Sequence, residues 1–137
     1  MREYLFRGKR VDNGEWVEGY LNYNSARKQY YIMDDVNAFP IPVHKESVGQ
    51  WTGVCDENGR KIFEGDIISI MFETDRVDGF PGYAWYESAA VVFSEEKCAW
   101  IVVFDDGGEE IYLNEYDNMD DVRIIATVFE NVDLLEG

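Results

Sequence analysis

The stretch from Gln50 to Ile68 constrains the fold most, because it holds a strand end, a tight turn and a strand start within nineteen residues. At its centre, Asp56-Glu57-Asn58-Gly59 predicts a chain reversal, since Asn and Gly adopt the positive φ angles that a tight turn requires. The residues from Phe63 to Ile70 then predict a turn that leads into an alternating strand, as at the start of many small barrels. The stretch indicates an architecture and carries no recognisable chemistry.

Further strand candidates recur at short intervals, separated by clusters of Asp, Asn and Gly. They cover residues 4–7, 15–21, 29–33, 67–72, 89–93, 99–104, 110–113 and 122–129. Pro40 and Pro42 place residues 37–43 at a sheet edge or in a loop, because each proline removes a ladder donor. The longest loop is expected at residues 74–83, and short helical turns only at 114–121 and 130–135.

These signals predict a mainly β fold, either all-β or α+β with only short helices. We expect small barrel-like, hairpin-rich antiparallel sheets, with an SH3-like barrel as one such form. A chain of 137 residues has the size of one domain and should bury roughly two-thirds of its unfolded surface. The prediction is one domain over residues 1–137, with two β subdomains meeting near residues 50–66 as the alternative.

The formal net charge of −16 is unevenly distributed. Residues 1–50 hold seven acids and seven bases, residues 51–100 sum to −6, and residues 101–137 sum to −10. Direct binding to nucleic acid or to an anionic membrane is disfavoured, because both depend on Lys and Arg. The chain also lacks a signal-peptide pattern and an apolar run of about 18 residues, so we expect a cytoplasmic protein.

The residues that could support catalysis or metal binding do not form a recognisable site. His44 is the only histidine, and neither Cys55 nor Cys98 has a local pattern typical of a nucleophile or a zinc ligand. Asp117, Asp120 and Asp121 could gather on a helical turn, but a solvated acidic face is the more ordinary interpretation. We therefore predict no catalytic residues, no cofactor and no metal.

An unusual aromatic cluster lies within residues 79–86, at the end of the expected long loop. Its members are Phe80, Tyr83, Trp85 and Tyr86. These rings either close over the core at a sheet end or form an exposed contact patch for a protein partner.

Three parts of the chain resemble the YopX family of bacteriophage and prophage proteins. The resemblance rests on Tyr4 to Arg10 with Gly14 to Gly19, on Gln50 to Gly53 with Asp56, Asn58-Gly59 and Ile62 to Ile67, and on Ile124 to Leu135. It implies a mostly β fold and a phage or prophage setting inside a bacterium. The family has no assigned activity, so it supplies no catalytic residues.

The leading functional hypothesis is a non-enzymatic accessory protein that acts as a homo-oligomeric binding or assembly module, with a protein partner as a further option. The alternative is an acidic nucleic-acid mimic that binds a host or phage nucleic-acid-binding protein, since its carboxylates could stand in for phosphates. An enzyme with an unrecognised site is the third hypothesis.

Overall fold

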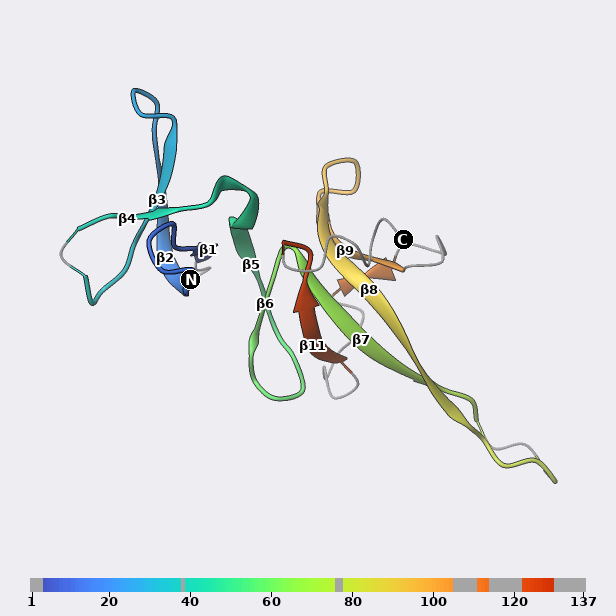
Figure 1. Cartoon of the computed structure of the whole chain (residues 1–137). Helices are drawn as coiled ribbons and strands as arrows, with labels where there is room; N and C mark the ends of the chain where they lie inside the picture. The colour runs from blue at the N-terminus through green and yellow to red at the C-terminus, as the bar shows by residue number, and fades with distance from the viewer. Residues whose placement is uncertain (1–3, 38, 76–77, 105–110, 114–121, 130–137) are drawn as a thin grey trace. The chain divides into compact units, whose positions relative to one another are not determined.

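The computed structural model describes residues 4–37, 39–75, 78–104, 111–113 and 122–129 (Figure 1). The chain divides into two compact units, Met1–Gly53 and Val54–Gly137. The elements in chain order are β1 (Phe6–Lys9), β2 (Trp16–Asn24), β3 (Gln29–Met33), β4 (Ile41–Val43), η1 (Lys45–Ser47), β5 (Gly49–Cys55), β6 (Lys61–Phe63), β7 (Asp66–Glu73), β8 (Ala84–Ser94), β9 (Ala99–Phe104), β10 (Ile111–Tyr112) and β11 (Val122–Thr127).

The first unit is an antiparallel sheet with the order β4-β3-β2-β1-β5, which β6 continues beyond β5. One face packs around a small core of Val17, Ile32, Ile41 and Val43. Glycines let the backbone approach closely here, since a Cβ on Gly8 would lie 2.9 Å from the Val43 side chain. A Cβ on Gly19 would lie 2.2 Å from the Met33 carbonyl oxygen, so a side chain at this position would displace β3.

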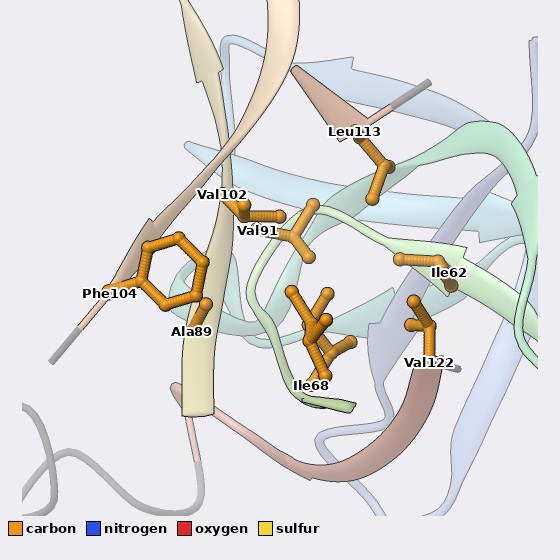
Figure 2. Packing of buried hydrophobic residues seen from close by; sticks show 9 residues of the cluster. Ile62, Ile68, Ala89, Val91, Val102, Phe104, Leu113 and Val122 are labelled. Carbon is orange, nitrogen blue, oxygen red and sulfur yellow. The ribbon is translucent and has the colours of Figure 1, made fainter. Parts of the chain in front are cut away.

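The second unit is built on an antiparallel sheet with the order β10-β9-β8-β7-β11. Its core side chains converge from several strands, as Figure 2 shows for Ile68 on β7, Val91 on β8 and Val102 on β9. Burying each such aliphatic side chain contributes about 1.5–3 kcal/mol to folding, so this cluster is the main source of stability in the unit.

The turn between β5 and β6 is fastened to the outer edge of β11. Oδ1 of Asp56 accepts hydrogen bonds from the backbone N–H of Asn58 and Arg60, each at 2.9 Å. Oδ2 accepts from the N–H of Ile124 at 3.2 Å, and the Arg60 guanidinium donates to the Ile124 carbonyl at 2.7 Å. Burial raises the pKa of Asp56, but hydrogen bonds from these N–H groups outweigh it, and the pKa lies below its ordinary value of 3.8. The carboxylate therefore joins two parts of the chain that are far apart in sequence.

The mainly β, antiparallel prediction is confirmed, but the barrel-like and SH3-like forms are not, because neither sheet closes into a barrel. In the first unit the sheet curls until Arg10 and Val43 form a single antiparallel bridge, which is too little to close it. Within the described residues the helical conformation is confined to the 3-10 turn η1 and to Leu113. The predicted helical turns at 114–121 and 130–135 lie outside the described residues.

Candidate protein-association site

Within the part of the chain that the structure describes, the β7–β8 hairpin continues past the strands that flank it. β11 pairs with β7 only from Asp66 to Ile70, and β9 pairs with β8 only from Ala89 to Ser94. The ladder between β7 and β8 nevertheless continues to the pair Glu73 and Ala84 (Figure 1). We call residues 71–75 and 78–86 the arm. Among the described residues, no third strand pairs with it.

One face of the arm carries a row of aromatic rings that begins at the core. Phe72 lies against the core residue Phe104, with ring centroids 6.0 Å apart, and stacks on Trp85 at 5.7 Å. The Trp85 ring is followed by the Tyr83 ring, with centroids 6.0 Å apart. Phe72 and Trp85 are cross-strand partners, and Tyr83 follows on the same face because side chains alternate along a strand. This row, Phe104, Phe72, Trp85 and Tyr83, is the aromatic row.

All four residues predicted for partner contact lie in the arm and are exposed. The exposed fractions are 75% for Phe80, 70% for Tyr83, 40% for Trp85 and 71% for Tyr86. Tyr86 pairs with Met71 on the face opposite to Trp85, so aromatic surface is present on both faces. The alternative was that these rings close over the core. Only Trp85 comes near the core, and it does so indirectly, by stacking on Phe72.

The end of the arm is held by local hydrogen bonds. The Thr74 N–H donates to the Tyr83 carbonyl at 2.9 Å, and the Tyr83 N–H donates to the Thr74 hydroxyl at 3.0 Å. A Cβ on Gly82 would lie 2.3 Å from the Thr74 carbonyl oxygen, so glycine is required where the strands approach each other. These contacts keep the arm extended and present its rings to solvent.

This arrangement suits protein association. Exposed Trp, Tyr and Phe side chains are enriched at the centres of interfaces, where a few aromatic residues carry most of the binding energy. Among the described residues, the outer edges of the arm pair with no third strand, and backbone groups on such edges can pair with an added strand. The arm carries both kinds of contact in one segment.

The candidates for chemistry are not brought into a recognisable site. Cys55 and Cys98 are free thiols, and Cys98 lies exposed in the β8–β9 turn with a φ of 50°. The described part of the chain contains no group of three His, Cys, Asp or Glu side chains placed to hold a metal ion. Asp117, Asp120 and Asp121 lie outside the described residues. No helix in the described ranges is long and apolar enough to cross a membrane.

Sequence reasoning missed a second surface, on the first unit. Side chains alternate along β1 and β2, so Arg7 and Lys9 share the face opposite to the core with Trp16 and Tyr20. The Arg7 guanidinium carbon lies 4.7 Å from the Trp16 ring centroid, and Lys9 Nζ lies 5.5 Å from it. The alternation of residues 15–21 was a signal for this face, but the partner strand that supplies the cations was needed to identify it.

Comparisons with known proteins place the chain in a family. The model of the YopX family, described as YopX protein, matches residues 5–136, and the chain therefore belongs to this family. The crystal structure of protein EF1440 from Enterococcus faecalis is similar, with a TM-score of 0.51 and 16% sequence identity, over 98% of this chain and 99% of that one. At this identity the likeness supports the fold alone. No curated protein matches the chain.

Proposed function

We propose that this member of the YopX family is a non-enzymatic accessory protein of a phage or prophage, which acts in the cytoplasm of the bacterial host by binding further copies of itself through the arm. The observation that carries the proposal is the exposed aromatic surface on a two-stranded ribbon that extends past its neighbouring strands. The phage setting and the bacterial cytoplasm follow from what the family resemblance implies.

The energetics of the ribbon support an interaction role. An isolated two-stranded ribbon is marginally stable in water at best, and beyond Phe72 the aromatic rings of the arm are exposed. Large exposed apolar patches on a protein surface are usual at sites of association. An arm that contacts another chain would bury these rings and gain the stability that it lacks alone.

The absolute mass in solution, measured by light scattering after size exclusion, tests this proposal. We expect the wild-type chain to have a mass that is a multiple of 15.9 kDa and that persists at high salt. The double variant Tyr83→Ala/Trp85→Ala should be monomeric, because two rings of the aromatic row are lost. Phe39→Ala is the matched control, since it removes an exposed ring outside the arm. A wild-type chain that remains monomeric at high concentration would refute the proposal.

A second candidate function is the acidic mimic of nucleic acid, and the distribution of charge favours it. Residues 54–137 hold 21 acids against five bases, so they account for the whole net charge of −16. A mimic would bind a basic partner with an affinity that falls steeply with salt. The test is a pull-down from bacterial lysate at low and high salt. If no nucleic-acid-binding protein is recovered at low salt, this candidate is eliminated.

A further inference from the structure

The net charge separates the two units sharply. Residues 1–53 hold seven acids and seven bases, whereas residues 54–137 carry all of the net charge of −16. Contacts between second units are therefore opposed by like charges, while contact between a second unit and a first unit is not.

The arm itself shares this acidic character. Residues 71–86 contain Glu73, Asp75 and Asp78 against Arg76 alone, for a net charge of −2. An isologous contact, in which the same patch meets itself across a two-fold axis, would place two such arms side by side and bring their acids together. A neutral or basic surface is a better partner for the arm.

The first unit offers such a surface on the face of its sheet that points away from the core. This outer face includes Arg7, Lys9, Trp16, Glu18, Tyr20 and Met33, and these six side chains comprise two cations and one acid. Tyr20 and Met33 are cross-strand partners with exposed fractions of 66% and 43%. Trp, Tyr, Met and Arg are the residue types enriched at interface centres. The outer face thus combines aromatic surface with the charge opposite to that of the arm.

We infer that the chains associate head to tail, with the arm of one copy seated on the outer face of the next copy's first unit. This inference rests on the proposed self-association and adds its geometry. In it, the aromatic rings of the arm pack against Trp16, Tyr20 and Met33, while the arm's acids lie near Arg7 and Lys9. Tyr83 and Trp85, which share one face of the arm, supply roughly 250 Å² of exposed aromatic surface. That is about a third of the ~800 Å² that each partner contributes to a standard interface.

A head-to-tail contact has a consequence that a two-fold contact lacks. Each copy uses two different surfaces, so the assembly either closes into a ring or grows as a filament. A copy with a damaged arm therefore still has an intact outer face, and a copy with a damaged outer face still has an intact arm. The two kinds of damaged copy should therefore pair with each other.

Mixing complementary variants tests this geometry. The arm variant is Tyr83→Ala/Trp85→Ala, and the face variant is Lys9→Glu/Tyr20→Ala. Phe39→Ala is the control in each measurement of mass by light scattering. We expect each of the two variants to be monomeric alone. Their equimolar mixture should give a species with twice the 15.9 kDa chain mass and no larger assembly, because only one intact interface can form. Raising salt from about 50 to 500 mM should weaken this heterodimer several-fold without abolishing it, since charged groups contribute to the contact beside the aromatic rings.

The outcomes separate this inference from the proposed function. If the wild-type chain is monomeric, both fail. If the wild-type chain is oligomeric and the arm variant is monomeric, but the mixture gives no heterodimer, the proposed function stands and the head-to-tail geometry is wrong. A face variant that keeps the wild-type mass would also overturn the geometry. Circular dichroism of each variant checks its fold, and Tyr20→Ser replaces the face variant if the double substitution does not fold.

Discussion

The β5–β6 turn and the end of the arm are two chain reversals with similar composition but opposite surroundings. Both use Asp and Gly with positive φ at a glycine, which is 79° at Gly59 and 83° at Gly79. The first reversal buries the Asp56 carboxylate against β11, whereas the second lies in solvent with its aromatic rings exposed. The comparison shows that turn chemistry sets a reversal locally, while long-range contacts decide whether it serves stability or remains available for binding.

The largest difference in unfolding free energy is expected between the core of the second unit and the exposed arm. Ile68→Ala removes a fully buried side chain of β7 and should lower the free energy of unfolding by about 4 kcal/mol, because it leaves a cavity. Tyr86→Ala in the arm is the matched control and should cost less than about 1 kcal/mol, since its ring is exposed. Urea denaturation followed by circular dichroism measures both. Equal losses would contradict the distinction.

The next largest effect concerns the carboxylate that fastens the turn. Asp56→Ala leaves three backbone N–H donors without their acceptor and should lower the free energy of unfolding by about 3 kcal/mol. Asp78→Ala, in the exposed reversal, should change it by less than about 0.5 kcal/mol. Thermal unfolding of the two variants beside the wild-type chain gives the comparison.

The same carboxylate makes stability depend on acid. The pKa of Asp56 is lower in the folded chain than its ordinary value of 3.8, so its contribution is complete above that value and is lost as the pH falls through the folded pKa. We expect the urea midpoint to fall below about pH 4 in the wild-type chain. Asp56→Asn should show a shallower decline, and an identical pH profile for the two proteins would show that Asp56 is not responsible.

Amide hydrogen exchange compares the local stability of the two regions within one protein. The Gly65 N–H donates to the Val91 carbonyl at 2.9 Å, and the Thr74 N–H donates to the Tyr83 carbonyl at the same distance. The first bond lies at the packed end of the hairpin and the second in the arm. In the arm variant Tyr83→Ala/Trp85→Ala, we expect the Gly65 amide to exchange about 100-fold more slowly than the Thr74 amide, because the arm opens locally. Similar rates would indicate that the arm is as stable as the core.

The smallest expected effect is at Glu64, which lies between β6 and β7. Burial raises the pKa of Glu64 above its ordinary value of 4.5, so its favourable contribution is present in acid and is lost as the pH rises through the folded pKa. Glu64→Gln should therefore raise the free energy of unfolding at pH 7 by about 0.5 kcal/mol and change nothing near pH 3. The exposed Glu73→Gln serves as the control in the same titration of urea midpoints.

Much of the strand pattern could be predicted from the sequence, because it depends on local signals. The predictions at 29–33 and 99–104 agree with β3 and β9, the segment with Pro40 and Pro42 forms the edge strand β4, and the loop at 74–83 separates β7 from β8. The predicted strand at 89–93 covers only part of β8, which begins at Ala84. Its first residues are exposed on both faces of the arm, so they lack the alternation by which half-buried strands are identified.

The remaining features depend on contacts between distant residues. Asp56 was identified as a turn residue, but its bond to Ile124 spans 68 positions and has no local signature. The four aromatic residues at the arm were identified from composition, whereas their exposure was established only by the structure. The barrel prediction was wrong for the same reason, since closure is a property of strand order and not of any single strand.

The fastened turn also governs how the sheet of the second unit ends. Asp56, Glu57 and Arg60 occupy backbone groups of Val122 and Ile124 that would otherwise accept or donate to a new strand. An edge strand with open groups is a template on which other chains can add and grow into fibrils. Because the turn and its side chains already occupy these groups, Val122 and Ile124 offer fewer free positions to an added strand at this edge of the sheet.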